Sequence, residues 1–69
     1  MIIMQRKVRD AQRRWVRKGD YVRRLDQPEK VGRVRFMTKR SIEVTLTSGG
    51  LGLDWWSAGT FVKHDRKTP

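Results

Sequence analysis

The sequence predicts a small, mostly β domain, and three observations support this prediction. The chain has 69 residues, which is the size of one small domain. Apolar and polar side chains alternate in several short runs, as they do in strands with one buried face. Segments rich in glycine, proline and small polar residues separate these runs and predict tight turns. Five short strands joined in this way suit a small barrel, which leaves no sheet edge exposed.

The first fifteen residues carry a helical spacing instead of an alternating one. Their apolar side chains recur at intervals of four, three and four residues, which places them on one face of a helix. These residues are Met4, Val8, Ala11 and Trp15. No N-capping residue precedes the pattern, and a helix this short is marginal on its own. We therefore predict either a basic helix that docks its apolar stripe or a frayed basic arm over residues 1–15.

Alternation with a period of two follows and predicts a five-stranded barrel over residues 16–64. Strands are expected near residues 20–25, 31–38, 41–48, 51–57 and 60–64. The turns between them are expected at residues 26–30, 38–41, 48–50 and 57–59, which hold Pro28 and three of the six glycines. The polar segment 65–69 is predicted to be a flexible tail.

The phase of each run predicts which side chains face inward. Val34 and Phe36 share one face of their strand, so both are expected in the core. Trp55 is in phase with the two leucines before it and is also expected in the core. Trp56 then points to the opposite face, where it packs under the N-terminal segment or presents its ring to a partner.

The charge of the chain predicts the class of its partner. Lys and Arg number 17 against 7 Asp and Glu, which gives a net charge of +10 at pH 7. Such a density of positive charge is repulsive unless a polyanion or an acidic protein neutralises it. Nucleic acid is the commonest polyanion in a cell, and contacts to its phosphates supply most non-specific affinity.

Several other classes of protein are disfavoured by the composition. Cysteine is absent, which removes disulfides, cysteine-based zinc sites and thiol catalysis, and a cytoplasmic protein is expected. The apolar start at residues 1–4 is too short for a signal peptide or a membrane span. His64 is the only histidine, and the carboxylates are scattered without metal-ligand spacing. We expect neither an enzyme nor a cofactor.

Three short motifs carry a resemblance to a known group of domains. Residues 16–22 are Val-Arg-Lys-Gly-Asp-Tyr-Val, residues 32–34 are Gly-Arg-Val, and residues 42–46 are Ile-Glu-Val-Thr-Leu. This succession resembles the KOW/Tudor-like group of SH3-like barrels over about residues 16–64. The resemblance implies a five-stranded SH3-like barrel. It also implies a binding module, since members of the group bind RNA, RNA polymerase or methylated tails.

The predicted binding surface combines basic side chains of the first two strands, the turn after them and the segment before them. Consecutive strands usually lie side by side, so these side chains can form one surface. Weak sequence preference is expected, because nothing resembles a base-reading helix. The predicted nucleic-acid-binding residues are Arg13, Arg14, Arg17, Lys18, Arg23, Arg24, Arg33, Arg35, Lys39, Arg40 and Trp56.

Other hypotheses stay open at this point. The cations can form a solubilising face without a ligand. Alternatively, the chain is an adaptor that docks its N-terminal apolar stripe or Trp56 on an acidic partner, such as RNA polymerase or a ribonucleoprotein. The same stripe can support a homo-oligomer. DNA and RNA, and single and double strands, fit the charge pattern equally well.

Overall fold

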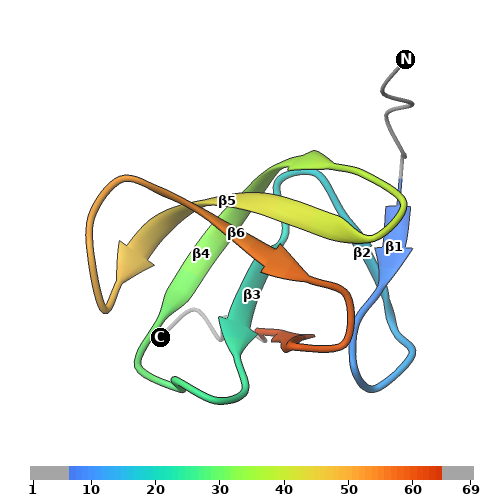
Figure 1. Cartoon of the computed structure of the whole chain (residues 1–69), viewed down its shortest axis with the longest axis horizontal. Coiled ribbons are helices and arrows are strands. Elements are labelled where there is room, and N and C mark those ends of the chain that lie inside the picture. The colour runs from blue at the N-terminus through green and yellow to red at the C-terminus, as the bar shows by residue number, and fades with distance from the viewer. Residues whose placement is uncertain (1–6, 65–69) are drawn as a thin grey trace, which may run out of the picture.

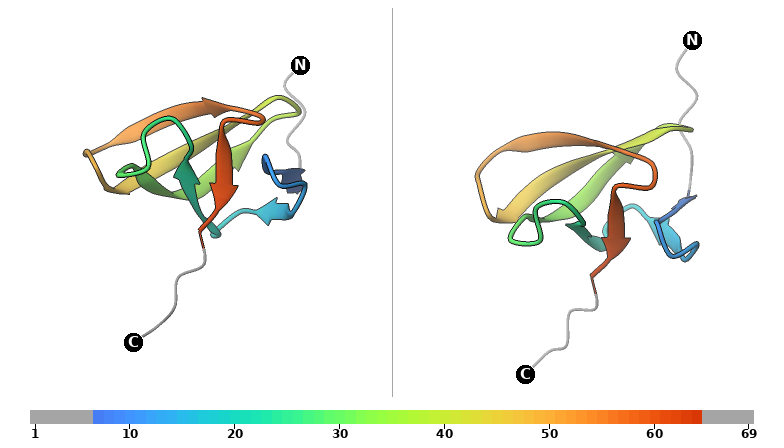
Figure 2. Two further views of the ribbon diagram at one scale, coloured as in Figure 1. Left: turned by 90° about the horizontal axis from the view of Figure 1, so that it is seen from below. Right: turned by 60° about the horizontal axis from the view of Figure 1, so that its bottom comes forward.

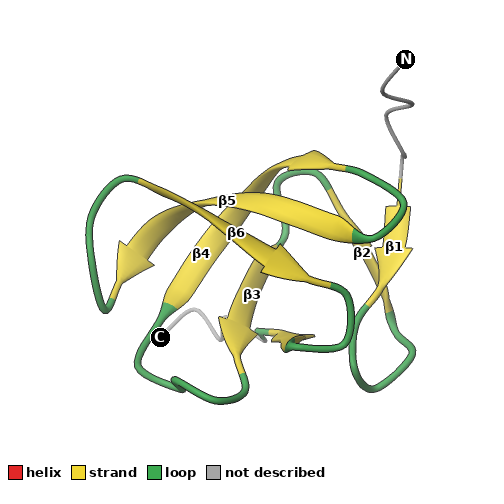
Figure 3. Ribbon diagram, in the orientation of Figure 1, coloured by secondary structure: helices red, strands yellow, loops and turns green. Residues whose placement is uncertain are grey.

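The computed structural model describes residues 7–64, which form two antiparallel sheets and contain no helix (Figures 1 and 3). The small sheet is a hairpin of two strands, β1 (Lys7–Arg9) and β2 (Trp15–Arg17). The large sheet has five strands in the order β6-β5-β4-β3-β7. These strands are β3 (Tyr21–Arg24), β4 (Val31–Met37), β5 (Ser41–Ser48), β6 (Leu53–Ser57) and β7 (Phe61–Lys63).

The five predicted strands are confirmed, because β3 to β7 begin and end within two residues of the expected limits. The expected closed barrel is wrong: β6 and β7 are the two edges of the large sheet and do not pair within the described residues. The free side of β7 is occupied by the turn after β1. There the Ala11 N–H donates to the Phe61 carbonyl, and the Lys63 N–H donates to the Asp10 carboxylate. Figure 2 shows the hairpin beside β7 in both views.

The N-terminal helix is also wrong in its described part, because residues 7–15 form β1, a turn and the start of β2. Met4, the first residue of the proposed stripe, and the predicted tail 65–69 lie outside the described residues. Hydrogen bonds to Asp10 explain the difference. Its carboxylate accepts the backbone N–H groups of Gln12 and Arg14, which in a helix would donate to backbone carbonyls instead. Of the described residues of that stripe, Val8 is buried, whereas Ala11 and Trp15 are exposed.

Nine buried apolar side chains form one core on the inner face of the curled sheet. Two of them, Val8 and Val16, are paired across the hairpin, so that the hairpin covers the core with one face. The nine residues are Val8, Val16, Val22, Val34, Met37, Ile42, Val44, Trp56 and Phe61.

A β-bulge in β4 changes which residues face outward. Val34 pairs with Val44, but Phe36 pairs with Glu43, so β4 carries one residue more than β5 between these pairs. Arg35 is the extra residue, and the shift turns Phe36 away from the core. Met37 faces inward in its place and is 2% exposed. The prediction that Phe36 lies in the core with Val34 is therefore wrong.

Gly32 allows β4 and β5 to approach each other closely beside this bulge. A Cβ at Gly32 would lie 2.7 Å from the Cβ of Val44, a distance that real side chains do not reach. The glycine is thus required by packing where β4 enters the sheet.

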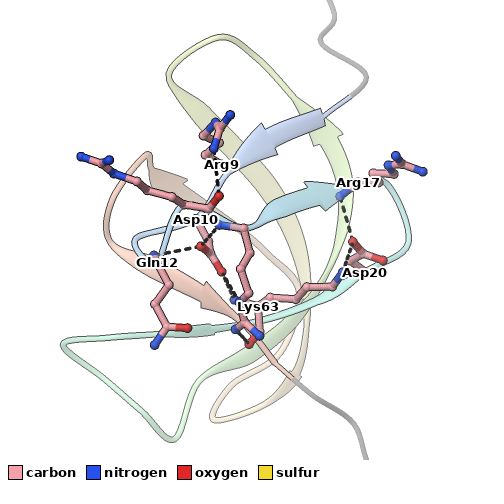
Figure 4. A network of polar contacts seen from close by, with 8 residues as sticks. Arg9, Asp10, Gln12, Arg17, Asp20 and Lys63 are labelled. Atoms are coloured by element: carbon pink, nitrogen blue, oxygen red, sulfur yellow. Dashed lines mark hydrogen bonds and ion pairs between the residues drawn. The ribbon is translucent and has the colours of Figure 1, made fainter.

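Asp10 holds the hairpin to the large sheet (Figure 4). One carboxylate oxygen accepts the N–H groups of Gln12 and Arg14 at 2.9 and 2.8 Å, which closes the turn. The other oxygen accepts the Lys63 N–H of β7 at 2.7 Å. The Arg14 guanidinium lies 3.4 Å from this second oxygen and also donates to the Lys63 carbonyl at 2.7 Å. The side chain of Asp10 is fully buried, so these contacts replace its hydration.

This environment sets the ionisation of Asp10. Burial is the largest influence and opposes the charged form. The three backbone N–H donors and the Arg14 guanidinium together outweigh burial, and the pKa of Asp10 lies below its ordinary value of 3.8. Because the folded pKa is lowered, the stabilisation is fully present above the unfolded pKa and is lost as the pH falls through the folded value.

We predict that Asp10→Asn lowers the free energy of unfolding at pH 7 by about 2 kcal/mol. The amide keeps one acceptor for the turn but places an N–H₂ group against the Lys63 N–H. Urea unfolding followed by circular dichroism measures the change. Across the acid range, the stability of the variant should depend less on pH than that of the wild type.

The matched control is Asp26→Asn, which removes an exposed carboxylate paired with Arg24. It should change stability much less than Asp10→Asn. If the two substitutions lower the free energy of unfolding equally, Asp10 is not the residue that holds the hairpin to the large sheet.

Candidate nucleic-acid interface

An open hollow of about 600 Å³ lies on the outer face of the large sheet, beside the turn between β2 and β3. Its basic side chains are Lys18 from this turn and Arg33 and Arg35 from β4. Arg33 and Arg35 flank the inward-facing Val34, so the alternation of the strand aims both guanidinium groups outward. The remaining lining residues are Gly19, Val34 and Thr45.

The three cations of the hollow differ in how they are held. The Arg33 Nε donates to the Gly19 carbonyl at 3.3 Å, and its guanidinium lies 6.0 Å from the centroid of the Tyr21 ring. These contacts orient Arg33 without neutralising it. Arg35 forms an ion pair with Glu43, with 3.1 Å between Nε and Oε1.

Lys18 has no carboxylate oxygen within 4.0 Å among residues 7–64. Of the three basic side chains in the hollow, Arg35 is paired with a carboxylate, that of Glu43, so the hollow keeps a positive charge. A lysine ammonium and a partly restrained guanidinium are groups that bind phosphate oxygens.

Trp55 lies exposed on this outer face, and Trp56 lies in the core. Ile42 of β5 is buried and pairs with Trp56, whereas Glu43 faces outward and pairs with Trp55. Directly opposite residues share one face of a sheet, so β5 fixes the phase of β6. Trp55 is 49% exposed and Trp56 is fully buried. The prediction of a core Trp55 is wrong, because Leu53 and Trp55 of β6 lie on the outer face. Trp56, which was predicted to bind nucleic acid, is buried and presents no ring on the surface.

The indole N–H of buried Trp56 has a hydrogen-bond acceptor on its own strand. Its indole N–H donates to the Asp54 carboxylate at 3.0 Å. This hydrogen bond is the main cause that lowers the pKa of Asp54 below its ordinary value, against the opposing effect of burial. The Arg24 guanidinium lies 6.0 Å from the Trp56 ring centroid and pairs with Asp26, so Arg24 takes part in holding this end of the sheet.

Trp55 contributes to an aromatic strip beside the hollow. Its ring meets Phe36 edge to face, with 5.9 Å between centroids and an interplanar angle of 79°. Both residues pair with Glu43 across β5, which places them in one row on the outer face. Leu53 of β6 is 53% exposed and pairs with Thr45, which lines the hollow.

The structure brings together only part of the predicted basic surface. Lys18, Arg33 and Arg35 line one hollow. Arg14 and Arg24 form the ion pairs with Asp10 and Asp26 described above. The others lie elsewhere: Arg13 in the turn between β1 and β2, Arg17 at the end of β2, Arg23 on β3, and Lys39 and Arg40 in the turn between β4 and β5.

A second group of cations surrounds Trp15 on the outer face of the hairpin. Lys7 Nζ lies 4.2 Å and the Arg9 guanidinium carbon 4.3 Å from the centroid of the Trp15 ring. The pairing of Arg9 with Trp15 in the hairpin brings these side chains together. From the sequence alone, Trp15 was expected in a helical stripe, and Lys7 and Arg9 were not among the predicted binding residues. The alternation of Lys7 and Arg9 around apolar Val8 is the sequence pattern that could have predicted a strand with both cations on its outer face.

Residues 7–64 contain no group of three or more His, Asp or Glu side chains that could hold a metal ion. Within the same range, no helix is long and apolar enough to cross a membrane.

We predict that Trp56→Ala lowers the free energy of unfolding by about 3–5 kcal/mol, because it empties a fully buried site. Trp55→Ala should change it by less than about 1 kcal/mol, because half of that side chain is already in solvent. Thermal melts of both variants measure the difference. A larger loss in Trp55→Ala would contradict the inward and outward assignment of the two tryptophans.

Comparison with known proteins gives no relative: no protein-family model, no curated protein and no solved structure matches the chain.

Proposed function

We propose that this protein is a small nucleic-acid-binding module without catalytic activity, and that its incompletely closed five-stranded sheet is an SH3-like fold of the KOW/Tudor-like kind. The topology of the large sheet supports the fold. Strands β3 to β6 follow one another as an antiparallel meander, and β7 returns to pair with β3. The hairpin β1–β2 takes the place that we had expected a helix or arm to fill.

The observation that carries the proposal is the basic hollow of Lys18, Arg33 and Arg35. The chain has a net charge of +10, and three of its described cations line one open concavity. A phosphate bound in the hollow can be attracted by the ammonium charge of Lys18 and can accept a directed hydrogen bond from the Arg33 guanidinium. The Arg33 fork is already oriented by Gly19 and Tyr21, which reduces the entropy lost on binding.

Weak sequence preference is part of the proposal. Contacts to phosphates position a protein on nucleic acid but carry no base information. The described residues contain no helix to enter a major groove, and the hollow lies on a sheet face. Affinity should therefore depend strongly on salt and weakly on sequence.

A second candidate function, a protein adaptor, is favoured by the free edge of β6. Leu53 and Trp55 of β6 are 53% and 49% exposed, and Leu51, in the turn before β6, is 96% exposed. An acidic protein segment could cover these side chains and meet the nearby cations. Affinity capture from a lysate with and without nuclease separates the two functions, because an adaptor retains its partner after nuclease treatment and a nucleic-acid-binding module does not.

We predict that neutralising the hollow weakens nucleic-acid binding more than neutralising any other pair of cations. The test variant is Lys18→Gln with Arg33→Gln, and the control is Lys39→Gln with Arg40→Gln, which removes the same charge from the turn between β4 and β5. Fluorescence anisotropy with a labelled oligonucleotide at several salt concentrations measures affinity. The slope of log K against log salt should fall by about 1.5 in the test variant.

The control variant should retain most of that slope and fold equally well by circular dichroism. If both variants lose the same affinity, binding depends on net charge alone and not on the hollow. If the wild type binds neither DNA nor RNA at low salt, the proposed function is wrong.

A further inference from the structure

We infer that the nucleic acid bound at the hollow is single-stranded and that Trp55 stacks on one of its bases. The inference rests on the proposed function, which supplies the phosphate contacts. It adds a binding residue outside the basic cluster and selects one class of nucleic acid. Three features of the outer face support this inference. They are the exposure and restraint of the Trp55 ring, the distance of the ring from the hollow, and the position of Glu43.

The Trp55 ring is both exposed and supported. Half of the side chain is in solvent, although it lies on a regular strand of the sheet. The edge-to-face contact with Phe36 restricts the movement of the ring. The backbone N–H of Trp55 donates to the Asp54 carboxylate, which helps to fix the backbone that carries the ring. A restrained aromatic ring loses little entropy on binding, which is the property of a stacking platform.

The hollow and the ring are separated by one strand. Arg33 and Arg35 belong to β4 and Trp55 to β6, and all three face outward across β5. Two strand spacings amount to roughly 10 Å. A base on the ring and a phosphate in the hollow can therefore belong to neighbouring nucleotides of one strand.

Glu43 lies between the hollow and the Trp55 ring, and its charge determines which part of a bound nucleotide can lie over it. It is paired with Arg35 at 3.1 Å and its side chain is only 17% exposed, so a partly covered carboxylate lies on the outer face between Phe36 and Trp55. A phosphate placed there would meet like charge. A base or sugar over Glu43, with the phosphate held by Lys18 and Arg33, avoids this repulsion.

A duplex cannot use this arrangement. Its bases are stacked on one another and paired, so no base face is available to a ring on a sheet. Unpaired bases can stack on an aromatic side chain whatever their identity, in agreement with weak sequence preference. The structure therefore favours single strands over duplexes of the same charge.

Trp15 provides an internal comparison. It is 41% exposed, almost as much as Trp55, but Lys7 and Arg9 already lie over its ring. A base would have to displace these cations before it could stack there. Trp15 is thus the matched control for Trp55.

The experiment measures binding of a short oligothymidylate and of a duplex with the same total number of phosphates by fluorescence anisotropy. We expect the wild type to bind the single strand more tightly. Trp55→Ala should weaken single-strand binding about tenfold to a hundredfold and leave duplex binding nearly unchanged. Trp55→Phe should keep most of the affinity and Trp55→Leu should not, because only the former retains a ring. Trp15→Ala should bind like the wild type.

Each other outcome overturns a defined part of the proposal. Equal binding of single strand and duplex, unaffected by Trp55→Ala, would overturn stacking and leave the proposed function standing. Absence of binding to either probe would overturn both. If polyglutamate binds as tightly as the oligothymidylate and depends equally on Trp55, the surface takes an acidic protein segment, and base stacking is wrong. Circular dichroism of every variant confirms that it is folded.

Discussion

The bulge in β4 is the constraint on which both the core and the proposed site depend. Without the extra residue at Arg35, strict alternation from Val34 would bury Phe36 and turn Met37 outward. With it, Met37 fills the core, and Arg35 and Phe36 both lie opposite outward-facing Glu43. One irregularity therefore places a guanidinium and an aromatic ring side by side on the outer face. Bulges commonly re-aim side chains in this way next to functional sites.

The carboxylates of this basic chain are used mainly to build local structure. Asp10 binds three backbone N–H groups and joins the hairpin to β7. Asp20 accepts the Arg17 N–H and closes the turn that leads into β3, as Figure 4 shows. Asp54 accepts the indole N–H of Trp56. Because these acids stand at turns and near the core, they leave Lys18 and Arg33 on the outer face without a carboxylate partner in the described chain.

Much of the fold could be predicted from the sequence, because the strands from Tyr21 onward carry regular alternation and clear turn residues. The hairpin could not, since Val8 and Val16 are its only inward side chains and the hydrogen bonds of Asp10 depend on β7, far away in sequence. The site was found only in part. The sequence identified Lys18, Arg33 and Arg35, but the exposure of Trp55 follows from its pairing with Glu43, which no pattern within β6 reveals.

The central claim is that one face of the large sheet binds nucleic acid through Lys18, Arg33 and Trp55 together. Titration of the ¹⁵N-labelled protein with an oligothymidylate, followed by NMR, tests it most directly. We expect the largest shifts at the backbone amides of Gly19, Arg33 and Arg35 and at the indole N–H of Trp55, with small shifts in the β1–β2 hairpin. Shifts spread evenly over all basic residues, or centred on Trp15, would contradict the claim.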